Sequence, residues 1–181
     1  MIIPGLVYIP NFISDMQQQY IAADIDNHSW SSELSRRVQH YGYKYDYKNR
    51  SVDESMRVDD LLPWMKVYGQ KFVDRGLFSD VPDQAIINEY KIGQGIGKHI
   101  DCQPCFNDTI ASLSLLSGCI MEFSRSEEVL ELYLEPKSLL VISAEARYNW
   151  FHGIPARRFD HGVARARRIS VTFRNVIVQD S

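Results

Sequence analysis

Two histidines and one aspartate have the types and spacing that could hold a metal ion. His99 and Asp101 stand two positions apart, and His152 follows much later in the chain. Side chains two apart in an extended strand point to the same side, so His99 and Asp101 could bind one ion. Taken alone, an H-x-D pair is better explained as a surface ion pair than as part of a metal site. Two imidazoles and one carboxylate on one face of a metal nevertheless form the ligand set of non-haem Fe(II) sites with open positions.

A segment near the C-terminus places two arginines where they could bind an anion. If residues 168–174 are extended, the even positions share a polar, cationic face and the odd positions share an apolar face. Burying two arginines in a small barrel is costly unless an anion lies between them. The Cα atoms of Arg168 and Arg174 would be roughly 20 Å apart, so their side chains could reach the two ends of a short dicarboxylate. Arg167 competes with Arg168, but Arg168 keeps the six-residue spacing to Arg174.

Four motifs occur in a fixed order: Asn88-Glu89-Tyr90, His99-Ile100-Asp101, His152-Gly153 and the pair Arg168 and Arg174. Together they resemble the AlkB family of Fe(II)- and 2-oxoglutarate-dependent dioxygenases, over roughly residues 85–176. The resemblance implies that His99, Asp101 and His152 bind Fe(II). It also implies that 2-oxoglutarate is held by Arg168 at its distal carboxylate and by Arg174 near its metal-binding end, with hydrogen bonds from Asn88, Tyr90 and Ser170.

The activity that this resemblance implies is oxidative N-demethylation of an alkylated nucleic-acid base. O2 and 2-oxoglutarate would be consumed, succinate and CO2 would form, and the methyl group would leave as formaldehyde. The segments Arg37–Gly42 and Ser112–Leu115 look closer to the branch that modifies the tRNA wobble uridine than to the bacterial repair enzyme. Methylated single-stranded DNA or RNA remains open as the partner.

Four tyrosines alternate with other residues between positions 41 and 47. A strand here would place all four rings on one side, either to cover a core or to form a lid on which a flipped base stacks. The family carries a nucleotide-recognition lid in this part of the chain. We therefore expect substrate contacts from Arg37, Tyr41, Tyr43 and Lys44, with the two cations touching phosphates.

The helix and strand patterns in the rest of the sequence predict a mostly β protein of the α+β class. Ser14-Asp15-Met16-Gln17 has the form of a capping box for a helix ending near Asp26, and Pro63 begins a second helix that ends at Arg75-Gly76. Strands are expected over residues 85–91, 98–101, 110–116, 119–123, 129–134, 139–143 and 169–178. We expect one domain over 1–181, with helices and the lid in 1–84 and a double-stranded β-helix (jelly roll) over 85–178, braced by the N-terminal helices.

Composition limits the alternatives. The chain has 181 residues, a net charge of −3 and no apolar run long enough to cross a bilayer or to form a signal peptide. We therefore expect a cytoplasmic protein that is a monomer and has no membrane partner. Arginines gather between positions 157 and 174, so one face could still contact phosphates.

Three cysteines do not suit a disulfide framework. Cys102 and Cys105 form a C-x-x-C pair, but no helix follows to stabilise a thiolate and a zinc site would need a fourth ligand. We expect two free thiols on a loop beside the iron, with no assigned function. Arg147 also matches a family pattern before the distal histidine, although a structural ion pair explains it equally well.

Two other functions are compatible with the sequence. The same iron site could hydroxylate or demethylate a protein or a small molecule, in which case turnover would not depend steeply on salt. The fold could also persist as a catalytically silent binding module, which would neither retain iron nor consume 2-oxoglutarate.

Overall fold

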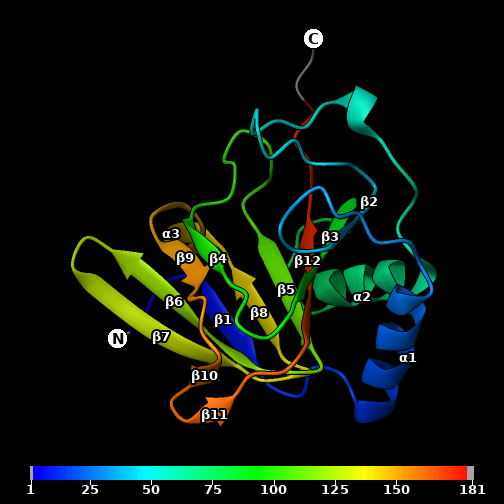
Figure 1. Ribbon diagram of the computed structural model, residues 1–181. Helices are drawn as coiled ribbons and strands as arrows, with labels where there is room; N and C mark the ends of the chain where they lie inside the picture. The colour runs from blue at the N-terminus through cyan, green and yellow to red at the C-terminus, as the bar shows by residue number, and fades with distance from the viewer. Residues whose placement is uncertain (1, 179–181) are drawn as a thin grey trace.

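Two antiparallel β-sheets face each other in the computed structural model, which describes residues 2–178 (Figure 1). The larger sheet has six strands in the order β1 (Leu6–Ile9), β8 (Leu139–Ile142), β5 (Ile110–Leu115), β12 (Arg168–Arg174), β3 (Gln84–Tyr90) and β2 (Val38–Tyr41). The smaller sheet has four, in the order β4 (Ile96–His99), β9 (Phe151–Ile154), β6 (Cys119–Arg125) and β7 (Glu128–Leu134). A short hairpin pairs β10 (Phe159–Asp160) with β11 (Val163–Ala164). The predicted mostly β fold is confirmed.

Two helices cover the larger sheet on the face that points away from the smaller one (Figure 1). Helix α1 (Asp15–Asp26) begins with the expected capping box between Ser14 and Gln17, and α2 (Pro63–Asp74) begins at its proline. A five-residue helix, α3 (Ala144–Tyr148), and a 3-10 turn, η1 (Glu54–Met56), were not predicted. No helix among residues 2–178 is long and apolar enough to cross a membrane.

Strand β12 divides the interior into two parts. Its residues Ile169, Val171 and Phe173 are fully buried in the core beneath the helices. Its alternate residues Ser170, Thr172 and Arg174 line a pocket between the two sheets. The predicted alternation of an apolar and a cationic face is therefore confirmed, and the cationic face points toward the smaller sheet.

The strands that carry the metal-ligand candidates differ from the prediction. Strand β4 ends at His99, so Asp101 lies on the loop that follows, whereas a single strand was expected to carry both residues. Strand β9, which carries His152, was not predicted at all. The expected final strand begins one residue earlier, at Arg168, and ends at Arg174.

The expected tyrosine strand is wrong beyond Tyr41. Gly42 has a φ of +77°, and a Cβ atom there would lie 1.9 Å from the carbonyl oxygen of Asp83, so the chain turns away from the sheet. Residues 42–62, here called the lid segment, then run between β2 and α2, with isolated bridges at Tyr43–Arg57 and Asp46–Ser51. The four tyrosine rings therefore do not share one face.

Candidate metal centre and cofactor pocket

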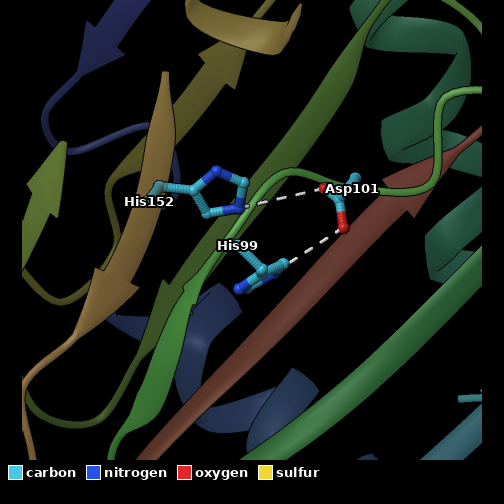
Figure 2. A group of neighbouring side chains, drawn as sticks. All are labelled: His99, Asp101 and His152. Carbon is cyan, nitrogen blue, oxygen red and sulfur yellow. Dashed lines mark ion pairs between the residues drawn. The ribbon is translucent and has the colours of Figure 1, made fainter. Parts of the chain in front are cut away.

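Cross-strand pairing brings the two histidines together. His99 on β4 and His152 on β9 are direct partners in the antiparallel register, and their ring centroids are 4.5 Å apart. Asp101 lies beside them. One of its carboxylate oxygens is 3.8 Å from Nε2 of His99, and the other is 3.9 Å from Nε2 of His152 (Figure 2). One ligand atom from each residue lies within 4.8 Å of the others. The structure thus assembles all three predicted metal ligands.

The free Nε2 atom of His99 and the protonation states of His152 and Asp101 suit a divalent cation. Nδ1 of His99 donates to the Gly97 carbonyl at 2.8 Å, which leaves the Nε2 lone pair free. Burial lowers the pKa of His152 to about 4, so this imidazole is neutral at pH 7. Burial acts to raise the pKa of Asp101, but the charge of Arg174, which donates to this carboxylate, opposes burial, and the pKa lies well below its usual range. Neutral imidazoles and an ionised carboxylate are the forms that bind metal.

Arg147 fixes the loop that carries Asp101. This side chain is fully buried and donates to the backbone carbonyls of Asp101, Cys102 and Phe106 at 3.0, 3.1 and 3.4 Å. Among residues 2–178 it has no carboxylate within ion-pair distance, so the interpretation as an ion pair is wrong. Arg147 therefore shapes the metal loop through the backbone.

Cys102 and Cys105 are joined by a disulfide, and the expectation of two free thiols is wrong. The tight turn between Asp101 and Phe106 brings their Cα atoms to 5.3 Å, which is within the usual range for a disulfide. Both residues are buried, together with Phe106 and with Tyr43 and Val52 of the lid segment. The disulfide therefore lies where the metal loop contacts the lid segment.

A pocket runs inward from the metal ligands between the two sheets, and we call it the inner pocket. Polar groups from Asn88, Tyr90, Ser170 and Arg174 line it, all predicted to bind 2-oxoglutarate. Arg174 donates to Asp101 at 3.1 Å, which places it at the metal end, and the hydroxyl of Ser170 shares a hydrogen bond of 2.8 Å with Ser112. The opposite wall, from the smaller sheet, is apolar and contains Met121, Phe123 and Ile154.

Arg168 has the environment expected for a carboxylate-binding residue. It is buried, stacks on the Tyr90 ring at 5.3 Å and donates from Nη2 to Ser114 at 2.8 Å. Its Nε and Nη1 atoms are buried and have no hydrogen-bond partner among residues 2–178. Arg167 instead pairs with Asp26 and Glu89, at 2.6 and 2.7 Å. Arg168 is not on the lining of the inner pocket, but Tyr90, on which it stacks, is, and its unused donors have the chemistry to bind a carboxylate.

The four residues expected to contact substrate lie elsewhere than over the metal. Arg37 forms two hydrogen bonds to Glu89, at 2.6 and 2.7 Å. Tyr41 lies in the core beneath the helices, Tyr43 donates to Glu54 at 3.2 Å, and Lys44 pairs with Glu33 at 2.9 Å. None of the four lines the inner pocket or its mouth. Their role in substrate binding stays a prediction.

A second hollow of about 460 Å³, here called the outer hollow, opens over His99 and Asp101. Its walls carry two aromatic rings, Tyr45 and Tyr47, and the cations Arg36 and Arg50, whereas the ammonium of Lys98, which also lines it, pairs with Glu122 at 3.2 Å. Asp101 is the one carboxylate on its described lining. Sequence reasoning noted Arg36 near the tyrosines but assigned neither it nor Arg50 to a site, because the two come from separate segments of the chain that the folded lid brings together.

Comparison with known proteins agrees with this geometry. The 2OG-Fe(II) oxygenase superfamily matches residues 25–174. The chain is 37% identical to the "Alkylated DNA repair protein ALKBH8 homolog" of Arabidopsis thaliana, over 96% of this chain and 59% of that protein. It is 40% identical to the "tRNA (carboxymethyluridine(34)-5-O)-methyltransferase alkbh8" of Xenopus tropicalis, over 87% of this chain and 26% of that protein.

A likeness to a solved structure supports the fold. "The structure of OsALKBH1" superimposes with a TM-score of 0.72 at 18% identity, and covers 97% of this chain and 98% of that one. The chain spans 59% and 26% of the lengths of the two relatives above. The superfamily match, the sequence relatives and the assembled His-Asp-His triad show that the chain belongs to the AlkB-like family of 2OG-Fe(II) oxygenases.

Proposed function

We propose that this oxygenase removes N-linked methyl groups from bases in single-stranded nucleic acid. The observation that carries the proposal is the outer hollow. It opens over His99 and Asp101, and it combines two tyrosine rings with Arg36 and Arg50. Aromatic faces stack bases of any sequence, while cations contact the phosphates beside them. A base seated against Tyr45 or Tyr47 would lie next to His99.

The relatives support a nucleic-acid substrate. One is named as an alkylated DNA repair protein and the other as a tRNA methyltransferase. Both names refer to whole proteins that are longer than the region matched here. They favour nucleic acid over a protein or metabolite, and they leave the choice between DNA and RNA to experiment.

The inner pocket and the outer hollow have separate roles in the proposed reaction. When bound, Fe(II) and 2-oxoglutarate supply the oxidising chemistry, in which O2 and 2-oxoglutarate are consumed and succinate and CO2 are formed. His99, Asp101 and His152 hold the metal. Arg168 binds the distal carboxylate of the cosubstrate, and Tyr90 and Asn88 orient it. The apolar wall of the inner pocket excludes water from the reacting groups.

Arg174 has a separate role in this scheme. It donates to Asp101 and stacks over Phe106 at 4.7 Å, so it holds the metal-binding carboxylate while its own side chain faces the inner pocket. Its position at the metal end suits it to stabilise the negative charge of the cosubstrate there.

The test measures succinate and formaldehyde from purified protein with Fe(II), ascorbate and 2-oxoglutarate, with and without a panel of methylated DNA and RNA oligonucleotides. Wild-type protein is expected to release formaldehyde in proportion to succinate with at least one oligonucleotide. The His99→Ala variant should release neither. Succinate formation that no oligonucleotide stimulates would refute the nucleic-acid substrate and favour a protein or metabolite.

A further inference from the structure

Arg36 is a cation of the outer hollow whose charge has no acidic partner. Among residues 2–178, no carboxylate lies within 4 Å of its guanidinium. Its Nε atom is buried and has no hydrogen-bond partner there, and its Nη1 atom reaches only the Gly95 carbonyl, at 3.5 Å. A partly buried guanidinium is costly to keep in this state unless another group stabilises it.

The Tyr90 ring is the group that Arg36 contacts. Strands β2 and β3 pair Val38 with Asn88, and the same antiparallel register continued by two residues places Arg36 opposite Tyr90. The Cζ atom of Arg36 accordingly lies over this ring, 5.4 Å from its centroid. A guanidinium within about 6 Å of an aromatic face is attracted by the ring quadrupole.

The backbone on both sides of Arg36 is anchored to the strand and turn that it faces. The side-chain amide of Gln94 donates to the carbonyl of Ser35 at 2.9 Å, and the backbone N–H of Glu89 donates to the carbonyl of Arg37 at 3.0 Å. The Arg36 side chain therefore extends toward the ring from a fixed backbone.

Tyr90 connects this contact to the cosubstrate pocket. It lines the inner pocket, and Arg168, its direct cross-strand partner, stacks on the same ring at 5.3 Å. Burial raises the pKa of the Tyr90 hydroxyl, while the charges of Arg36 and Arg168 act against burial. The phenol is therefore protonated at neutral pH, and its O–H can donate to a carboxylate oxygen.

We propose that Arg36 is a positioning residue for the cosubstrate, which holds the Tyr90 ring so that its hydroxyl donates to 2-oxoglutarate. The inference rests on the proposed function, in which Tyr90 orients the cosubstrate. Arg36 lies on the outer hollow and is not on the lining of the inner pocket, so it acts through the ring. The surface that binds the substrate strand is thereby connected to the residue that orients the cosubstrate.

The test is a double-mutant cycle on 2-oxoglutarate binding, measured by anaerobic calorimetry with Mn(II) in place of Fe(II). Tyr90→Phe should raise the Kd roughly tenfold or more, because one hydrogen bond to a charged group is lost. Arg36→Met should raise it roughly 3- to 30-fold in wild type but less than twofold in the Tyr90→Phe background. A direct effect of the Arg36 charge on the dianion would persist in that background and would overturn the proposal.

A second readout follows the ring without any cosubstrate. In protein labelled with 3-fluorotyrosine, the ¹⁹F resonance of Tyr90 is identified by its loss in the Tyr90→Phe variant. This resonance should shift or broaden in Arg36→Met, because the ring loses the guanidinium that holds it. An unchanged resonance would show that Arg36 does not hold the ring.

The neighbouring arginine provides the control. Arg37 points to the other side of the chain, where it pairs with Glu89 at 2.6 Å and stacks on Trp30 at 4.9 Å. Arg37→Met should therefore leave the Kd for 2-oxoglutarate within twofold of wild type, and an equal loss of affinity in both arginine variants would contradict the proposal. If Arg36→Met does not fold in a urea titration, Arg36→Gln serves in the same cycle.

The outcomes separate this role from the proposed function. Arg36→Met protein that binds 2-oxoglutarate as wild type does overturns the positioning role, and the proposed function survives if wild type still releases formaldehyde from a methylated oligonucleotide. The predicted cycle together with no formaldehyde from any oligonucleotide supports the role of Arg36 and refutes the nucleic-acid substrate.

Discussion

Replacement of Arg168 by methionine should separate two effects, because it should weaken 2-oxoglutarate binding without lowering the stability of the fold. Arg168 is 2% exposed, its Nε and Nη1 atoms have no partner among residues 2–178, and no carboxylate there lies within 4 Å of it. Methionine has a similar volume and removes a buried charge that lacks a counter-ion. Because such a charge is costly to bury, the variant without cosubstrate should be at least as stable as wild type.

Binding of the cosubstrate should respond in the opposite way. Nε and Nη1 lie on different edges of the guanidinium, so one of them donates to a given carboxylate, and the loss of one charge-assisted hydrogen bond should weaken 2-oxoglutarate binding by about 1.5–3 kcal/mol. This corresponds to an increase in Kd of roughly 10- to 150-fold. Anaerobic calorimetry with Mn(II) in place of Fe(II) measures the Kd, and urea unfolding measures the stability.

The neighbouring residue provides the matched control. Arg167→Met removes the ion pairs with Asp26 and Glu89 on the other side of the strand, so it should lower the free energy of unfolding by about 1–2 kcal/mol while the Kd changes less than twofold. If Arg168→Met binds 2-oxoglutarate as tightly as wild type does, or if Arg167→Met is the variant that loses binding, the assignment of Arg168 is refuted.

Three further predictions concern the scaffold. Hydrogen bonds from Arg37 and Arg167 lower the pKa of Glu89 from 4.5 to about 2. The stabilisation of the fold by ionised Glu89 is therefore complete above about pH 4.5 and is lost as the pH falls toward 2. Because those arginines are partly exposed, Glu89→Gln should lower the free energy of unfolding by about 1–2 kcal/mol at pH 7 and by almost nothing at pH 2, as measured by urea titration. Reduction of Cys102–Cys105 should lower the same free energy by about 1–2 kcal/mol, since the closed loop is short, and equal thiol labelling of unfolded protein with and without reductant would contradict the disulfide. Phe72→Ala should lower it by about 3–5 kcal/mol because this ring is fully buried, whereas Val67→Ala on the exposed face of α2 should change it by less than about 0.5 kcal/mol.

Features that obey local rules could be predicted from the sequence. The Ser14 capping box and the proline at the start of α2 act within one helical turn, and both helices begin where these residues predict. The alternation along residues 168–174 is also local, and it predicted which face of β12 carries Arg168 and Arg174. The cofactor roles of Arg168 and Arg174 came from the family resemblance, and the alternation added that both lie on the polar face.

Features that depend on long-range contacts could not be predicted. Strand β9 has only four residues and includes Gly153, so it carries little strand signal of its own. Its position comes from pairing with β4 and β6, and the close approach to β4 requires the glycine, since a Cβ atom there would lie 2.9 Å from the Lys98 nitrogen. The lid segment depends likewise on Gly42 packing against Asp83, which a tyrosine pattern does not indicate.

A small hydrophobic cluster beneath the lid segment joins this segment to the loop that follows Asp101. Tyr43 and Val52 of the lid segment share this cluster with Cys102, Cys105 and Phe106 of the loop that follows Asp101. Whatever orders the loop also orders the surface on which the lid rests. For the nucleic-acid strand proposed above, thermodynamic reciprocity requires that the factor by which bound metal changes strand binding equals the factor by which a bound strand changes metal binding.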